Sequence, residues 1–309
     1  MSRIPAPVRF LGIVVVLVAI FGACGSLMLS AMDLAQQQET ANLFDPGVLF
    51  SHTLHFLQQA WGVLTVYTDQ TGVPLHDYFI RGVGLTIEFC FISMPLALLL
   101  GFVLALMSRA RAAWLRAPAR GFVEFFRNTP LLVQMLAIYF SLVFLPVWLV
   151  NAFTAGVATL VLNYAAYECE NIRAGLDAVD IGQDEAAAAL GLSQFQTLRF
   201  VTIPQMIPII LPPVINDIIY MYKDSSILSL ITIAELTSET EALTGHAATR
   251  FAWQAYLIAG GVYLLLSLPL ARLARWVEAR LKAVSFGAQT DLTSATLITL
   301  GVMVVIGLF

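Results

Sequence analysis

Apolar residues dominate this chain in long uninterrupted runs, and polar residues are concentrated in the segments between them. A helix needs roughly 20 mostly apolar residues to cross the ~30 Å hydrocarbon core of a membrane. Lipid admits only helices or closed barrels, and these runs lack the alternating polarity of barrel strands. The pattern predicts six helical spans and a possible seventh, over residues 10–32, 78–107, 131–150, 152–166, 207–222 with an extension to 234, 252–270 and 292–309.

The basic residues predict how these spans are oriented, because Lys and Arg near span ends are retained in the cytoplasm. If the N-terminus is cytoplasmic, all of the 16 basic residues except Arg81, Lys223 and Arg250 fall in cytoplasmic segments. This distribution also places the polar stretch 182–204 in the cytoplasm. The segments placed on the periplasmic side are residues 33–77 and the loop that holds Glu235, Glu239 and Glu241.

The two ends of the chain differ from its middle. The first apolar run could be a lipoprotein signal that is cut near Cys24, but the run continues past that residue, which favours an uncleaved span. The apolar C-terminal end could span the membrane, lie in the interface or contact a partner. The expected organisation is an N-terminal span over residues 1–32, a periplasmic loop over 33–77, a transmembrane domain over 78–282 and a C-terminal apolar segment over 283–309.

Composition excludes several classes of function. Only 12% of the residues are charged, about half of the ~25% that is usual in soluble domains. A net charge of -4 supplies none of the basic surface that nucleic acid requires. The histidines and the widely spaced Cys24, Cys90 and Cys169 form no ligand set, so no metal site or disulfide framework is predicted. The phosphate-binding motif Gly-x-x-x-x-Gly-Lys is also missing, so no ATP hydrolysis is expected in this chain.

The stretch GQDEAAAALGLSQFQTLRFVTIPQ, residues 182–205, predicts two short helices joined by a tight turn. Asp180 can cap the first helix, and Gly191 can end it in the left-handed conformation that glycine tolerates. Ser193 can begin the second helix, with Gln196 three residues later as in a capping box. Helices tied at both ends to membrane spans are expected to lie at the cytoplasmic surface.

The composition of the first helix favours contact with a protein. Helices that rest on lipid usually carry Lys or Arg on one face and large apolar residues on the other. This helix instead carries Asp184, Glu185 and a run of alanines, whose small side chains allow a close approach to a groove. The stretch is therefore interpreted as a docking element for a cytoplasmic partner.

The same stretch resembles the cytoplasmic EAA loop of ABC importer permeases, and the spacing of its residues is complete. The segments FRNTPLLVQ, IPQMIPIILPPVIND and YKDSSILSLI are similar to the polar amino-acid branch of that family. The resemblance covers about residues 78–282. The residues in the loop that correspond to the ATPase-coupling motif are Glu185, Ala186, Ala187, Gly191 and Pro204.

The resemblance implies an all-α integral membrane protein with a five-helix ABC importer permease core, an added N-terminal span and a possible C-terminal span. It implies a non-catalytic subunit in the bacterial inner membrane that moves polar amino acids from the periplasm to the cytoplasm. A dimer of cytoplasmic ATPases would bind ATP and Mg and contact loop 182–204, and a periplasmic amino-acid-binding protein would deliver the substrate. A second permease would complete the path, and the unusual termini favour a heterodimer over a homodimer.

Polar residues in the fifth predicted span are candidates for the translocation path. A charge inside the membrane costs at least ~2.5 kcal/mol unless it is paired or faces water. Asp217 and Asp224 are seven residues apart and share a helix face, which indicates an aqueous path or a satisfied ion pair. Pro204, Pro208 and Pro212 recur at every fourth position, which predicts a kinked or open start to the span, either as a hinge or as a structural bend. The other path candidates are Asn216, Lys223, Ser225 and Glu88.

Two polar features have structural alternatives to a role in transport. Glu88 could contact substrate, or it could hydrogen-bond to Thr86 or to a neighbouring helix. Arg127, Thr129 and Pro130 belong to the motif FRNTP, in which Thr129 or Asn128 can cap the next helix and Pro130 can be its first residue. An architectural role of this motif is favoured over a cytoplasmic gate.

Rival functions require features that the chain lacks. An ion-coupled secondary transporter is expected to contain inverted repeats, and neither the EAA segment nor the proline-rich span is repeated. A membrane-embedded enzyme would need a metal-binding motif or a nucleophile with its base at a plausible depth, and neither is visible. ABC import of another small polar solute, such as an opine, fits the same features as amino-acid import.

Overall fold

The computed structural model describes residues 58, 62, 74–141, 151–246 and 252–285, and these residues are almost entirely helical. The predicted span 1–32, nearly all of the predicted loop 33–77 and the possible span 292–309 lie outside the described residues. The helices are α3 (Leu75–Arg109), α4 (Ala113–Asn128), α5 (Leu131–Ser141), α6 (Ala152–Ala178), α7 (Ile181–Ala189), α8 (Gln194–Thr197), a π-helical turn (Leu198–Thr202), α9 (Ile203–Asp224), a 3-10 segment (Ser225–Ile231), α10 (Leu236–His246) and α11 (Ala252–Ser285).

The chain divides into two units, which are described separately. The smaller, Met1–Gly82 with Glu239–Val262, includes the start of α3, most of α10 and the first turns of α11. The larger, Val83–Ser238 with Tyr263–Phe309, contains the helices that form the candidate site.

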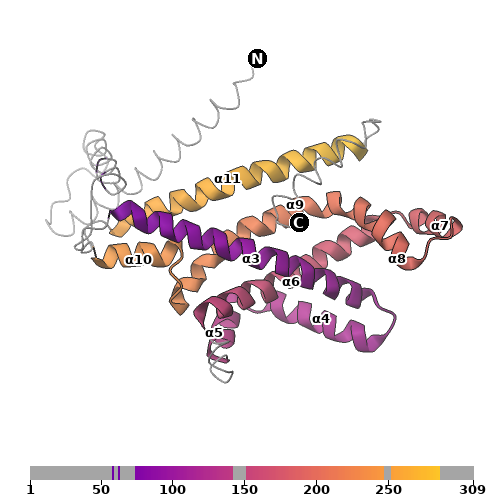
Figure 1. Ribbon diagram of the computed structural model, residues 1–309, viewed down its shortest axis with the longest axis horizontal. Helices are drawn as coiled ribbons and strands as arrows, with labels where there is room; N and C mark the ends of the chain where they lie inside the picture. Colours follow the sequence, from indigo (N-terminus) through magenta and orange to yellow (C-terminus); the bar gives the residue numbers. More distant parts are fainter. Residues whose placement is uncertain (1–57, 59–61, 63–73, 142–150, 247–251, 286–309) are drawn as a thin grey trace, which may run out of the picture. The chain divides into compact units, whose positions relative to one another are not determined.

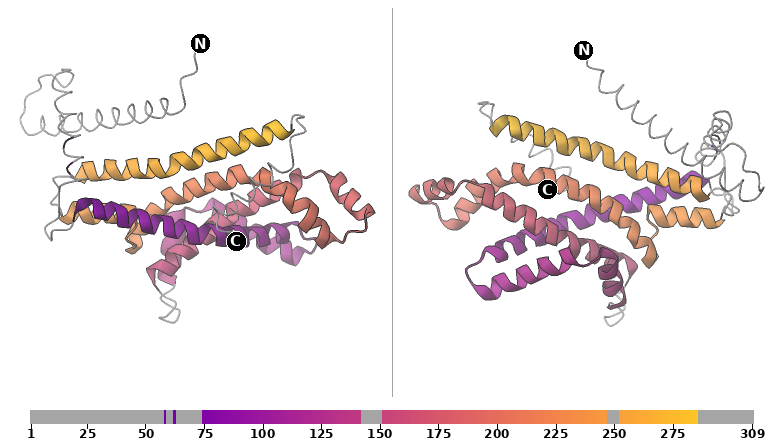
Figure 2. Two further views of the ribbon diagram at one scale, coloured as in Figure 1. Left: turned by 45° about the horizontal axis from the view of Figure 1, so that its top comes forward. Right: turned by 180° about the vertical axis from the view of Figure 1, so that it is seen from behind.

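Helix α6 lies at the centre of the larger unit and packs against α4, α5 and α9 (Figure 1). After a short turn, α4 runs back along the C-terminal part of α3, and the two form a helical hairpin (Figure 2). Helices α7 and α8 project from the end where α6 stops and α9 begins (Figure 1). The core between these helices is built from large apolar side chains that are almost fully buried, including Phe89, Met135, Leu160, Met221 and Leu228.

Glycines permit the close contact of α3 and α9 with α6. A Cβ atom at Gly101 of α3 would lie 2.8 Å from the Cβ of Glu168 and 3.0 Å from the carbonyl oxygen of Ala165. A Cβ atom at Gly175 of α6 would overlap the side chain of Ile210 in α9. Both helices therefore approach α6 more closely than any residue with a side chain would allow.

We expect Gly101→Ala to destabilise the larger unit, because the backbone of α6 cannot move aside as a flexible side chain could. Overpacking of this kind typically costs about 1–3 kcal/mol. The measurement is the apparent melting temperature of the purified protein in detergent, and it should fall. Gly84→Ala on the same helix is the matched control, since nothing lies within 4 Å of a Cβ atom at that position. Equal melting temperatures for the two variants would contradict the expectation.

Three described helical stretches are long and apolar enough to cross a membrane. They are His76–Arg109, Gln194–Ile231 and Gln254–Ala279. The first contains the predicted span 78–107, the second contains 207–222 and most of its extension to 234, and the third overlaps 252–270 from residue 254 onward. The class of all-α integral membrane protein is therefore confirmed.

Two other predicted spans differ from the helices that form. The span predicted over 131–150 begins as α5, which has only 11 residues, and residues 142–150 lie outside the described part. The span predicted over 152–166 continues to Ala178 as α6, which has 27 residues. Hydropathy underestimated the length of α6 because the second half of the helix is charged. These charged residues are compatible with the helix, since Glu170 and Arg173 pair at 2.6 Å across one helical turn.

Helix α4 was not predicted, because its segment was treated only as a basic connection between spans. Ala119 and Val123 of this helix are buried one turn apart in the core, whereas Arg120 and Glu124 are exposed. Apolar positions four residues apart are typical of an amphipathic helix. The basic residues lower the mean hydropathy and hide that pattern from a search for apolar runs.

Glu235, in the loop that the basic residues place on the periplasmic side, does not face solvent. Its carboxylate is fully buried, and it accepts hydrogen bonds from the backbone N–H groups of Thr237 and Ser238 at 2.9 and 2.8 Å and from the hydroxyl of Tyr263 at 2.8 Å. Burial raises the pKa of this carboxyl, and its hydrogen bonds oppose that shift. Glu235 thus satisfies the first N–H groups of α10, as an N-terminal capping residue does.

Candidate functional site

The stretch between α6 and α9 folds as its capping residues predict. The Asp180 carboxylate accepts a hydrogen bond from Gly182 N at 2.7 Å at the start of α7. Gly191 ends that helix with a φ of +78°. Ser193 and Gln196 form the predicted capping box at the start of α8, with bonds of 3.3 and 2.8 Å. The two short helices and the tight turn are confirmed.

Most of the predicted coupling residues are exposed on this loop. Glu185, Ala186, Gly191 and Pro204 are exposed, but Ala187 is only 3% exposed. Ala187 therefore packs within the chain, and a role for its side chain in direct contact with a partner does not fit. Apolar residues that sequence reasoning missed are much more prominent on the loop, and they are Ile181, Leu190, Phe195 and Phe200, between 62% and 82% exposed.

Polar contacts connect the loop to the start of α9. The Thr202 hydroxyl donates to the Asp184 carboxylate at 3.4 Å, and the amide of Gln205 donates to that of Gln183 at 3.1 Å. Between α8 and α9 the chain makes the π-helical turn Leu198–Thr202, a local widening that is often found at functional sites. Side-chain hydrogen bonds therefore connect α7 with the π-helical turn and with the first turn of α9.

The proline-rich start of the fifth predicted span is helical in the structure. Pro204 stands in the first turn of α9, directly after the π-helical turn, and its missing N–H makes no backbone bond back to that turn. Pro208, Pro212 and Pro213 lie within the helix and each removes a backbone hydrogen bond. A π-helical turn immediately precedes this span, and a kink at the prolines themselves stays a prediction.

A cavity of about 310 Å³ opens between α6, α9 and the junction of α4 with α5. It contains both carboxylates that the helix period placed on one face of α9, namely Asp217 and Asp224. The Asp224 carboxylate accepts a hydrogen bond from the hydroxyl of Tyr164 at 2.7 Å. The cavity is lined by Thr129, Leu131, Asn163, Tyr164, Tyr167, Asp217, Tyr220 and Asp224.

The other path candidates are not part of this lining, although Lys223 lies next to it. Asn216, Lys223 and Glu88 are exposed, and the Lys223 ammonium lies 5.5 Å from the centre of the Tyr220 ring. Ser225 is fully buried, and its hydroxyl donates to the carbonyl of Tyr222 at 2.8 Å. The proposed bond between Glu88 and Thr86 does not form, since the buried Thr86 hydroxyl accepts instead from the backbone N–H of Leu236 at 3.3 Å.

Helix α6 contributes polar groups next to the cavity that sequence reasoning missed. The amide nitrogen of Asn171 donates to the carboxylate of Asp217 at 2.8 Å and to that of Glu168 at 3.3 Å. Glu168 is fully buried, and its Oε1 atom has no hydrogen-bond partner in the described part of the chain. The sequence signal was the segment YECEN, but it falls beyond the predicted end of the span at residue 166.

The FRNTP motif forms the junction between α4 and α5, and Gln134 holds it together. The Thr129 hydroxyl donates to the carbonyl of Phe125 at 2.8 Å, so it closes the end of α4 and does not cap α5 as predicted. The amide nitrogen of Gln134 donates to the Phe126 carbonyl and to the Thr129 hydroxyl, and its oxygen accepts from Asn163 at 2.9 Å. Pro130 precedes Leu131, the first residue of α5.

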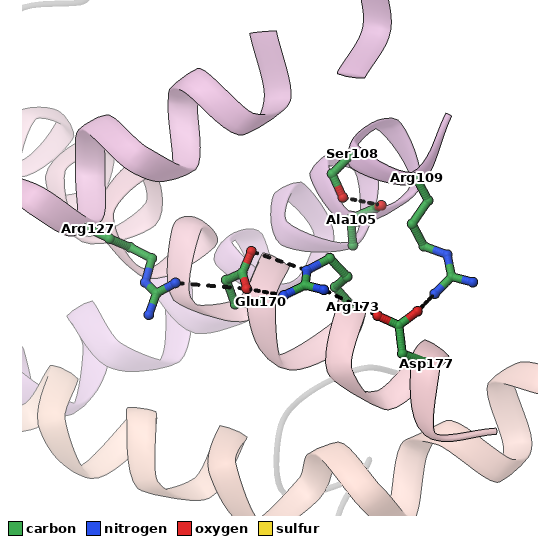
Figure 3. Close-up of polar contacts among 7 residues, drawn as sticks. All are labelled: Ala105, Ser108, Arg109, Arg127, Glu170, Arg173 and Asp177. Atoms are coloured by element: carbon green, nitrogen blue, oxygen red, sulfur yellow. Dashed lines mark hydrogen bonds and ion pairs between the residues drawn. The ribbon is translucent and has the colours of Figure 1, made fainter. Parts of the chain in front are cut away.

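An ionic network runs along α6 and joins it to the end of α3 and to the end of α4 (Figure 3). Arg173 of α6 lies 2.6 Å from Glu170 and 3.2 Å from Asp177, and Asp177 also pairs with Arg109 of α3. Arg127 of α4 is 3.9 Å from Glu170, and its guanidinium lies 5.5 Å from the centre of the Tyr167 ring. The predicted gate residue Arg127 is thus placed between the cavity wall and this network.

In the described part of the chain, no three His, Cys, Asp or Glu side chains are grouped so that they could hold a metal ion. The two cysteines in that part, Cys90 and Cys169, are free and buried.

Known proteins share both sequence and fold with this chain. It is 38% identical over 215 residues to the octopine transport system permease protein of Rhizobium radiobacter, covering 65% of this chain and 87% of the relative. It is 33% identical over 211 residues to the arginine transport system permease protein of Bacillus subtilis, covering 68% and 95%. A crystal structure of an amino acid ABC transporter with histidines matches with a TM-score of 0.60 and 35% identity, over 70% of this chain and 100% of the other.

The family comparison agrees with these relatives. Residues 97–283, more than half of the chain, match the model of the binding-protein-dependent transport system inner membrane component. This match spans the loop, the cavity and the ionic network. The ion-coupled and enzymatic alternatives have no support from it. The chain is a multi-pass inner-membrane protein that belongs to the binding-protein-dependent transport family, whose permeases act with an ATPase and a binding protein.

Proposed function

We propose that this chain is the permease subunit of an ATP-driven importer that moves polar amino acids from the periplasm to the cytoplasm. The observation that carries the proposal is the physical link between the two ends of α9. One end contacts the exposed loop of α7 and α8, and the other end places Asp217 and Asp224 at the cavity. A single helix thus connects a docking surface with a polar site among membrane helices.

The loop is proposed to dock on a dimer of cytoplasmic ATPases. Its exposed apolar residues, led by Leu190 and Phe195, can fill a groove, and its ends are fixed by α6 and α9. The chain itself is proposed to be non-catalytic, with ATP and Mg bound by the ATPases. The cytoplasmic position of the loop follows from the distribution of basic residues, which also places the N-terminus in the cytoplasm.

The cavity is proposed to form part of the substrate path. Its lining contains two carboxylates, three tyrosines and an amide, and no basic side chain among the described residues. Carboxylates inside a membrane favour a cationic group. The relatives named for arginine and octopine transport are consistent with an amino acid or an opine, and the match to the octopine permease keeps an opine as the second candidate.

A second permease is proposed to complete the path, and a related chain is favoured over a second copy. A periplasmic binding protein is proposed to deliver the substrate to this pair of permeases. The second permease and the binding protein follow from the family, and the added terminal segments are the reason for favouring a related chain.

The test is ATP-dependent uptake by proteoliposomes that contain the two permeases, the ATPase and a loaded binding protein. Amino acids with cationic, neutral and acidic side chains, and octopine, are supplied with their binding proteins. We expect uptake only with ATP and with binding protein. Uptake by this chain alone under an ion gradient would refute the proposal.

A further inference from the structure

The carboxyl group of Glu168 lies next to that of Asp217, one of the two carboxylates at the cavity. A single amide nitrogen, that of Asn171, donates to both groups, at 2.8 Å to Asp217 and at 3.3 Å to Glu168. The two carboxyl groups are also within hydrogen-bonding reach of each other. Glu168 is not among the residues that line the cavity, so it meets Asp217 from inside the helix packing.

Glu168 is enclosed by the helices around it. Its side chain is 0% exposed, and the backbone of α3 covers its start, because a Cβ atom at Gly101 would lie 2.8 Å from the Glu168 Cβ. In the described part of the chain, no basic side chain forms an ion pair with Glu168 or Asp217. Arg127 acts electrostatically on Asp217, but its ion pair is with Glu170, at 3.9 Å.

Two ionised carboxylates in this position would be strongly unfavourable. Burial of an ionised group costs far more than burial of a neutral one unless a cation pairs with it. The Oε1 atom of Glu168 has no hydrogen-bond partner among the described residues, so an ionised Glu168 would also lack a donor there. The negative charge of Asp217 beside it would add repulsion. One proton within the pair neutralises one group and supplies a donor to the other.

The surroundings of the two groups decide which of them holds the proton. Asp217 is half-buried and lines the cavity, where water can solvate a charge. It also accepts the shorter of the two bonds from Asn171. Glu168 has no access to solvent. The charge therefore belongs on Asp217 and the proton on Glu168.

We propose that Glu168 is a positioning residue that carries a proton and donates a hydrogen bond to the carboxylate of Asp217. With Asn171 as the second donor, it holds the charge of Asp217 in a fixed orientation at the cavity. The pair thus contributes one negative charge to the site instead of two. The proposal rests on the proposed function, because a substrate in the cavity is what the fixed charge would meet.

The first test is ATP-dependent uptake by the complete transporter in proteoliposomes. Glu168→Gln is neutral, has nearly the same size and keeps a donor, so uptake should stay close to the wild-type rate. Glu168→Leu is also neutral but has no donor, and uptake should fall roughly tenfold or more. Glu124→Leu makes the same change on an exposed carboxyl of α4 outside the lining of the cavity, and uptake should be unchanged. The ATPase that co-purifies with each variant shows whether the transporter has assembled.

A double variant separates positioning from a purely structural role. If Glu168 acts through Asp217, its removal should have no effect once Asp217 has lost its charge. The variant with both Asp217→Asn and Glu168→Leu should therefore transport at the same rate as Asp217→Asn alone. If Glu168 only stabilised the packing of the helices, the double variant would lose further activity.

Infrared spectroscopy of the purified transporter tests for the proton directly and needs no transport. The difference between the spectra of wild type and Glu168→Gln should contain the carbonyl band of a protonated carboxyl group, present in wild type only. This measurement decides the question even if Glu168→Leu does not assemble.

Four results would overturn the proposal. Glu168→Leu could transport at the wild-type rate, or Glu168→Gln could lose as much uptake as Glu168→Leu, which would show that a charge is needed there. The double variant could be less active than Asp217→Asn alone. The carbonyl band could be missing from wild type. Failure of wild type to take up substrate would count against the proposed function instead, and the infrared result would stand apart from it.

Discussion

Asp217→Asn and Asp224→Asn are each expected to reduce ATP-dependent uptake by roughly tenfold to a hundredfold. A hydrogen bond to a charged group contributes about 1.5–3 kcal/mol, and each variant removes one such charge from the cavity. Asp217 would lose its charge next to Asn171, and Asp224 next to the hydroxyl of Tyr164. The measurement is the initial rate of uptake in proteoliposomes at saturating ATP.

Two further variants serve as comparisons for the loss of uptake. Tyr164→Phe keeps the Asp224 charge and removes only its hydrogen-bond donor, so its loss of uptake should be smaller. Asp77→Asn makes the same chemical change at a half-exposed position in the first turn of α3, away from the cavity lining, and uptake should remain at the wild-type rate. Wild-type uptake by both cavity variants would remove Asp217 and Asp224 from the path.

Leu190→Ser is expected to weaken association with the ATPase by roughly 30-fold or more. Leu190 is 82% exposed at the end of α7, and apolar residues at the centre of an interface commonly contribute 2 kcal/mol or more. The helices should remain intact, because the caps Asp180 and Ser193 are unchanged. The measurement is the amount of ATPase that co-purifies with the permease in detergent.

The control for this second prediction is Leu230→Ser. Leu230 is 61% exposed in the 3-10 segment that follows α9, at the opposite end of that helix from the loop. Leu230→Ser removes a comparable apolar surface away from the loop, so the amount of ATPase that co-purifies should be unchanged. Equal losses for both variants would show that reduced apolar surface, and not the loop, accounts for the effect.

These predictions differ in how far the sequence alone anticipated them. The loop could be predicted closely, because each cap bonds to a backbone group only two or three residues away. The shared face of Asp217 and Asp224 could also be predicted, because helix period depends on the backbone alone. Helix α4 and the second half of α6 were missed, because their charged residues break the apolar runs from which spans are recognised.

The polar contacts at the cavity were decided by the packing of α6 against α9. Asn171 reaches Asp217 across 46 positions of sequence, and Tyr164 reaches Asp224 across 60. These contacts require the helices to pack closely, which Gly175 permits. Burial of Ala187 and exposure of Leu190 likewise depend on which face of α7 meets the rest of the chain. Local sequence was enough to specify helices, caps, membrane spans and family, because those depend on neighbours in the chain, whereas the polar cavity depends on contacts that exist only after the helices have packed.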